Sequence, residues 1–153
     1  MRIWLPAMVA LAVVPVGAHH PFTPYYDASR PASITGVVAE LRVVNPHVVL
    51  IIEGPGPDGS TGRWAFEGFP PTVLRRRQQG FEERLKPGTN ITISGWSATD
   101  PQARAFSGHQ ARLADGSTIV FGPTPGPPGA PEGWRCPSDD CPAYKYPDVR
   151  PRR

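Results

Sequence analysis

The chain has 153 residues, of which 16 are Lys or Arg and 13 are Asp or Glu, so its formal net charge is +3. This length is enough for one domain with its own core, and so small a charge does not by itself indicate a polyanionic partner. The 21 prolines and 16 glycines indicate a compact domain with a loop-rich extension.

The first 18 residues have the three-part pattern of a secretory signal peptide. Arg2 supplies the positive charge, residues 3–16 are apolar apart from prolines, and residues 16–18 are small or tolerated before a cleavage site. The apolar run is shorter than the roughly 20 residues that span a bilayer, which favours cleavage over the alternative of an uncleaved membrane anchor. We therefore expect a soluble protein, periplasmic or secreted, whose mature chain begins at His19.

Residues 19–31 contain three prolines and predict an extended lead-in. Residues 32–44 then alternate between two faces, and this period of two predicts a long strand with one buried face. Gly36 would allow the strand to bend. One face of the strand carries Thr35, Val37, Ala39, Leu41 and Val43.

Asn45-Pro46 ends this strand with turn-forming residues, and His47 follows directly. Further strands are predicted at residues 48–53, 63–67, 90–96, 103–113 and 118–121. The helical candidate runs from residue 71 to residue 79 and is stopped by Gly80, with a further turn at residues 81–85.

A helix between the third and fourth strands of a small antiparallel set is typical of the OB-fold, a partly open five-stranded Greek-key barrel. We therefore predict an all-β fold over residues 32–121. It is a small OB-fold-like β-barrel of five to six strands, with one short helix between strands three and four. Another small β-sandwich or roll is the alternative.

The tail, residues 122–153, is rich in proline and is predicted to be irregular. It carries the chain's two cysteines, Cys136 and Cys141. In an exported chain, cysteines so close together favour a small disulfide loop, which would cross-link the tail.

The most specific chemistry that the sequence indicates is a metal site made by His19, His20 and His47. After cleavage, His19 could chelate an ion through its α-amine and its ring, and His47 at the barrel rim could complete a three-nitrogen set suited to copper(II). His20 could instead bind through the amine, its backbone nitrogen and its ring, and the sequence does not choose between the two. The alternative without a metal is a solvated terminus and a His47 that bonds a backbone carbonyl.

The fourth histidine, His109, falls in phase with Ala111 and Leu113 on the expected core face of its strand. We therefore predict a half-buried histidine with satisfied hydrogen bonds. A bulge at Ser107-Gly108 would move it to the other face.

No nucleophile elbow, phosphate loop or metalloprotease motif is present, and nothing in the sequence pairs Asp27, Glu53 and Glu67 as acid and base. We therefore do not expect an enzyme. The basic run at residues 75–77 is predicted to be a solvated helix face rather than a nucleic-acid site.

Aromatic residues allow a further hypothesis. Trp64 and Trp96 fit a barrel core, but together with Tyr25 they could line a site for a small organic ligand or an oligosaccharide at the barrel mouth.

Several short motifs occur in a fixed order along residues 1–121. They are the His19-His20-x-Phe22 start after the signal peptide, Asn45-Pro46-His47, Trp64-x-Phe66-Glu67 and Leu85-Lys86-Pro87-Gly88. In this combination the chain resembles a family of small exported bacterial proteins of unknown function. The resemblance implies an exported OB-like domain and no activity. Pro21 departs from the small residue, such as Ser, that is usual there.

Three function hypotheses follow. The first is a small binding protein for copper(II). The second is a structural or interaction module that docks an envelope protein without a metal. The third is the barrel-mouth site for a small ligand.

Overall fold

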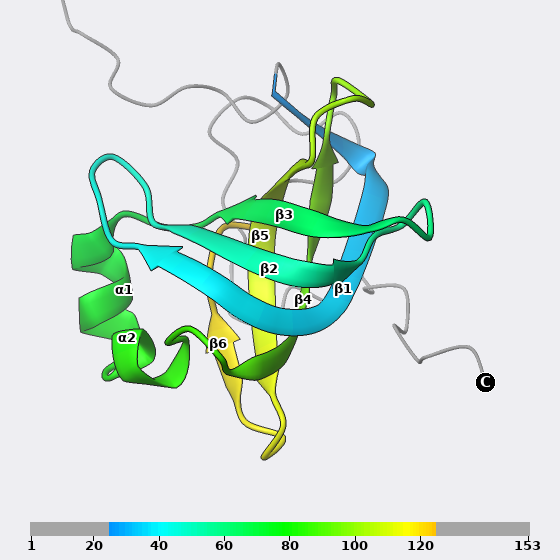
Figure 1. Cartoon of the computed structure of the whole chain (residues 1–153). Coiled ribbons are helices and arrows are strands. Elements are labelled where there is room, and N and C mark those ends of the chain that lie inside the picture. The colour runs from blue at the N-terminus through cyan, green and yellow to red at the C-terminus, as the bar shows by residue number, and fades with distance from the viewer. Residues whose placement is uncertain (1–24, 125–153) are drawn as a thin grey trace, which may run out of the picture.

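The computed structural model describes residues 25–124, which form a small β-barrel with two short helices at one end (Figure 1). The strands ring through β1, β2, β3, β5 and β4, and β6 is added beside β5. Their bounds are β1 Tyr26–Arg42, β2 Val49–Pro55, β3 Thr61–Glu67, β4 Asn90–Ala98, β5 Ala105–Leu113 and β6 Thr118–Val120. The ring and the position of the helices confirm the predicted OB-fold-like barrel.

β1 is shared between two neighbours because it is long and strongly curved. Its residues 26–37 pair with β4, and its residues 37–42 pair with β2. Gly36 lies at this change of partner, where a Cβ would come within 2.2 Å of the Glu53 carbonyl oxygen. The bend predicted at Gly36 therefore depends on close backbone approach. β1 begins six residues before the predicted start at Ala32, and part of the expected lead-in is strand.

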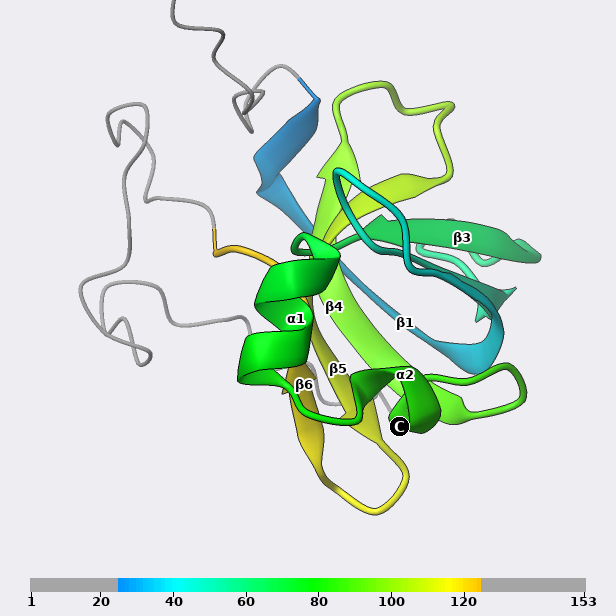
Figure 2. The same ribbon diagram turned by 90° about the vertical axis from the view of Figure 1, so that its left-hand side faces the viewer.

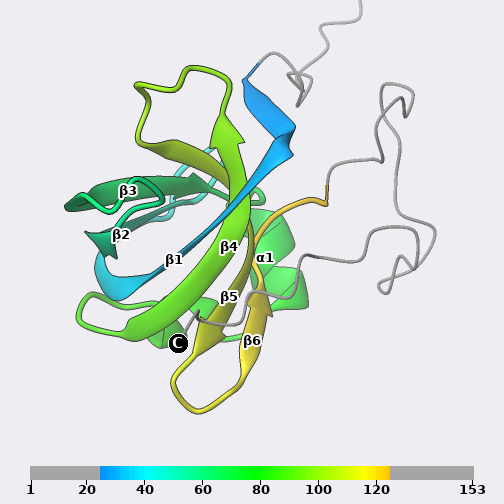
Figure 3. The ribbon, with the colours of Figure 1, turned by 90° about the vertical axis from the view of Figure 1, so that its right-hand side faces the viewer.

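The barrel closes where β3 meets β5 in a short parallel pairing of residues 65–67 with residues 105–107. All other pairings are antiparallel. Phe66 and Phe106 stack inside this closure, with ring centroids 4.7 Å apart. Figure 3 shows the adjoining wall, in which β4, β5 and β6 run side by side.

Helices α1 (Pro71–Arg77) and α2 (Phe81–Arg84) cover the end of the barrel between β3 and β4, as Figure 2 shows. Gly80 separates them with a positive φ of 70°, so the predicted stop is correct and the expected further turn is a second helix. Leu74, Phe81 and Leu85 are almost fully buried and join the main hydrophobic core.

The strict alternation predicted along β1 is wrong, because Ala39 forms a bulge opposite β2. Before the bulge, Ile34 and Val38 face the core, while Val37 is 40 % exposed. After it, Leu41 packs against the core. One extra residue therefore exchanges the two faces in mid-strand, and Val37 and Leu41 do not share a face.

A second bulge lies in β5, where Ser94 pairs with Gln110 but Gly95 pairs with Gly108. The extra residue is His109. It is 8 % exposed, and its ring meets the edge of Trp96 at 5.5 Å, outside the main core cluster. The bulge is centred one residue beyond Ser107-Gly108, the position that we considered as an alternative, and His109 is more deeply buried than the predicted half-buried state.

The predicted signal peptide, His19, His20 and the Cys136–Cys141 loop lie outside the described residues. Only residues 122–124 of the predicted tail are described, and they form no regular element. Within residues 25–124, neither helix is long and apolar enough to cross a membrane.

Candidate functional site

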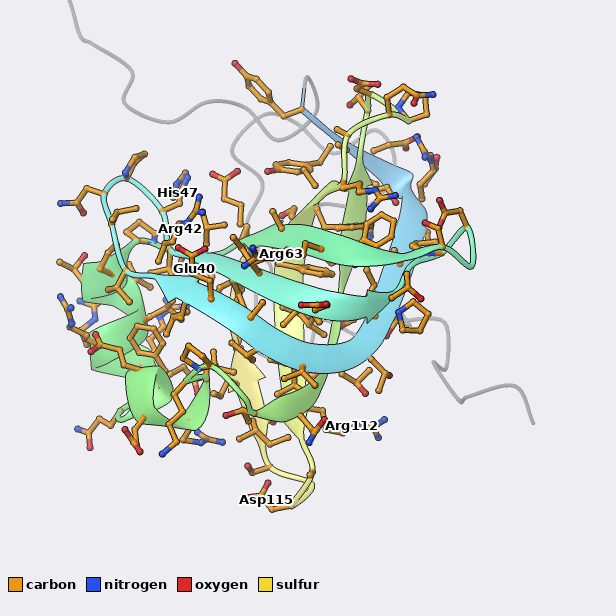
Figure 4. The ribbon with its side chains drawn as sticks, in the orientation of Figure 1. Glu40, Arg42, His47, Arg63, Arg112 and Asp115 are labelled. Carbon is orange, nitrogen blue, oxygen red and sulfur yellow. The ribbon has the colours of Figure 1, made fainter. Side chains whose placement is uncertain are left out.

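His47 lies in the loop between β1 and β2, at one end of the barrel (Figure 4). It follows the cis peptide bond Asn45–Pro46 and directly precedes Val48, which is fully buried. The Val48 N–H donates to the Phe69 carbonyl at 3.1 Å, and its own carbonyl accepts from the Gly68 N–H at 2.8 Å. The backbone after His47 is therefore fixed against the backbone after β3.

Glu67, the last residue of β3, contacts the His47 ring. One of its carboxylate oxygens is hydrogen-bonded to Nδ1 of His47, and the other accepts from the Tyr26 hydroxyl. The side chains of His47 and Glu67 are 25 % and 29 % exposed. The pKa of Tyr26 is raised, first by burial and then by the hydrogen bond to Glu67 and its charge. These three residues form the cluster that we call the Tyr26–Glu67–His47 cluster.

The cluster has a defined chemical consequence for the imidazole. When a carboxylate accepts a hydrogen bond from Nδ1 of a neutral imidazole, that nitrogen carries the proton and the lone pair resides on Nε2. This is the usual environment of a metal-binding histidine, whose second ring nitrogen donates to a carboxylate, a backbone carbonyl or water. The same environment suits a histidine that only accepts a hydrogen bond.

Sequence reasoning missed two of these three residues. Glu67 was one of three carboxylates without a predicted partner, and Tyr26 was placed in the lead-in. A signal for Glu67 existed, because in Trp64-x-Phe66-Glu67 the two aromatic rings face inward and the carboxylate ends the strand on the other face. No local signal joins Tyr26 to Glu67, which lies 41 residues further along the chain.

Among residues 25–124, no group of three or more His, Cys, Asp or Glu side chains could hold a metal ion. His47 is the one member of the predicted metal set inside this range. A metal site at His47 therefore needs ligands from outside the described part of the chain.

The three aromatic residues predicted for a small-ligand site have different environments. Trp64 is 4 % exposed and donates from Nε1 to the Gly54 carbonyl at 3.0 Å. Trp96 is 2 % exposed and packs against His109, whereas Tyr25 is 56 % exposed. Both tryptophans serve to pack the barrel, and neither offers an open ring face within the described residues.

Charged side chains on β1 and β3 form ion pairs with one another. Arg42 lies 2.7 Å from Glu40, and Arg63 lies 3.8 Å from the same carboxylate (Figure 4). The arginines at positions 75–77 are exposed on α1, and Arg75 pairs with Glu82 at 2.9 Å. Their exposure agrees with a solvated helix face.

Comparison with known proteins identifies the family of the chain and no activity. No curated protein matches it, and no solved structure matches it. A family model described as a family of unknown function (DUF6152) matches residues 7–107. This match includes β1 to β4, both helices and all three residues of the Tyr26–Glu67–His47 cluster. Because it spans more than half of the chain, the protein belongs to the DUF6152 family of unknown function.

Proposed function

We propose that the chain is an exported, non-enzymatic binding protein that takes up copper(II) through its processed N-terminus. In this proposal residues 1–18 are removed in the periplasm or on secretion. The His19 amine and ring bind the ion together with the His47 ring, and His20 is a neighbour or a competing ligand. Amine and imidazole nitrogens are donors that copper(II) prefers.

One observation carries the proposal. The Tyr26 hydroxyl and Nδ1 of His47 share the Glu67 carboxylate. The start of β1 and the β1–β2 loop therefore meet at the same end of the barrel. A lead-in that entered at the far end would have left His47 out of reach of the N-terminus.

Chain length is compatible with this arrangement. Seven peptide steps separate His19 from Tyr26, and an extended chain of that length spans up to about 23 Å. The Tyr26 side chain already reaches the carboxylate that holds His47. A folded-back segment of this length can therefore deliver the terminal amine to the His47 ring.

The test is a copper(II) titration with electron paramagnetic resonance (EPR), on protein purified from the periplasm with its N-terminus verified by intact mass. We expect tight one-to-one binding and a nitrogen-rich spectrum. His47→Ala should weaken binding and remove a nitrogen from the spectrum. A variant with one extra residue before His19 retains every histidine but blocks the terminal chelate, so tight binding should be lost in it as well.

A His20→Ala variant chooses between the two ligand arrangements, because only the arrangement through the His20 ring needs that side chain. Weak copper binding, or binding that neither His47→Ala nor the extension changes, would contradict the proposal. That outcome would favour an interaction module that docks an envelope protein.

A further inference from the structure

We propose that Glu67 is the positioning residue of this site and holds both of its halves with one carboxylate. One oxygen orients the His47 ring, and the other anchors the Tyr26 phenol at the start of the strand that follows His19 and His20. The inference rests on the proposed copper function, since it assigns to Glu67 and Tyr26 a role in ligand placement.

Glu67 is itself held on both sides. It pairs with Val49 of β2 and with Ser107 of β5, at the place where the barrel closes. The following residue, Gly68, donates to Val48, and Phe69 donates to the Phe121 carbonyl at 2.8 Å. A carboxylate rooted in so constrained a backbone can fix the direction of a neighbouring ring.

Tyr26 crosses between strands that are not neighbours in the sheet. Its backbone pairs with Ala98 of β4, whereas its hydroxyl reaches Glu67 on β3. The Thr99 N–H donates to the Tyr25 carbonyl at 2.9 Å, which continues this pairing. The phenol therefore ties the chain segment that leads from the N-terminus to the carboxylate beside His47.

The shared carboxylate has a specific effect on the imidazole. Holding the proton on Nδ1 presents the Nε2 lone pair as the ligand atom and prevents ring rotation that would exchange the two nitrogens. Loss of such an outer-shell partner typically lowers metal affinity about 10–100-fold. If the Glu67 carboxylate only stabilised the barrel, its loss would change thermal unfolding without changing the His47 tautomer or the EPR spectrum of bound copper.

Three variants separate these roles. Glu67→Gln keeps the shape but leaves a single carbonyl oxygen for two donors, and Tyr26→Phe removes only the hydroxyl. Glu53→Gln is the matched control, because Glu53 is an exposed carboxylate on neighbouring β2. Each variant is measured with its processed N-terminus by ring ¹⁵N NMR without metal, by copper(II) titration with EPR, and by thermal unfolding.

We expect wild-type His47 to carry its proton on Nδ1, and Glu67→Gln to shift this proton toward Nε2. Copper affinity should fall about 10–100-fold in Glu67→Gln and less in Tyr26→Phe, with altered EPR parameters in Glu67→Gln. Glu53→Gln should match wild type in all three measurements.

Two results would overturn the inference, and they differ in what else they contradict. If wild type binds copper tightly and folded Glu67→Gln matches it in tautomer, affinity and spectrum, the positioning role is wrong and the copper function remains. If correctly processed wild type does not bind copper, both proposals are wrong.

Discussion

Replacing Gly68 by alanine should destabilise the barrel at its closure. A Cβ at this position would lie 2.5 Å from the Phe121 ring and 2.7 Å from the Phe121 carbonyl oxygen. Relief to an ordinary contact of 3.4 Å needs shifts of about 0.7–0.9 Å. The Phe121 ring is fully buried and its carbonyl already accepts from Phe69, so neither group can move freely.

Overpacking of this kind costs about 1–3 kcal/mol. We therefore expect Gly68→Ala to lower the free energy of unfolding by that amount, measured by urea denaturation with an unchanged m-value. Each kcal/mol should lower Tm by about 4–8 °C in a domain of this size.

Gly62→Ala, in β3 itself, is the matched control. There a Cβ meets Arg104, with its guanidinium nitrogen at 2.1 Å. The end of a flexible, exposed side chain can move aside. In the wild type, the Arg104 guanidinium lies 4.8 Å from the centroid of the Trp64 ring. Loss of this contact costs about 0.5–1 kcal/mol at an exposed site. Alanine recovers about 0.4–1 kcal/mol by restricting the unfolded chain. Equal stabilities of the two variants would refute the argument.

Three further predictions concern single residues. Phe66→Ala should lower the free energy of unfolding by about 3–5 kcal/mol, measured by urea denaturation, because Phe66 is fully buried. Burial, then the hydrogen bond and charge of Glu67, raise the pKa of Tyr26 above 10.0. The unfolded chain therefore releases this proton first, and wild-type stability should fall by up to about 1.4 kcal/mol per pH unit above pH 10, a slope that Tyr26→Phe loses. Burial lowers the pKa of His109 below 6.5. The unfolded chain therefore gains this proton first as pH falls, and wild-type unfolding free energy should decrease below pH 6.5 more steeply than that of His109→Gln. Parallel slopes for variant and wild type would contradict either pH argument.

The elements of the fold were predictable because local rules determine them. The strand in residues 32–44, whose two faces exchange at Ala39, the Asn45-Pro46 turn and the Gly80 stop each depend on a few neighbouring residues. The helix between β3 and β4 was enough to select the barrel topology. The two bulges were not predictable in the same way, because Ala39 and His109 become extra residues only against the registers of β2 and β4.

Of the three residues in the cluster, only His47 was predictable, for the same reason. His47 stands out because it follows a turn and directly precedes the predicted strand at residues 48–53. Its partner Glu67 is 20 residues away, and Tyr26 is 41 residues from Glu67. Each contact exists only because separate strand pairings bring β1 and β3 to one end of the barrel. Such a contact depends on register, which no local pattern contains.

Closure of the barrel and geometry of the cluster depend on the same few residues. Residues 65–67 are where β3 pairs on both sides, and Glu67 is the last of them. The residue after it, Gly68, is the one whose Cβ would push against Phe121. A substitution that loosens this closure must therefore displace the Glu67 carboxylate from His47. It follows that Gly68→Ala should disturb the His47 ring signals even where the barrel remains folded, whereas Gly62→Ala, at the other end of β3, should leave them unchanged. Unchanged His47 signals in folded Gly68→Ala would contradict this reasoning.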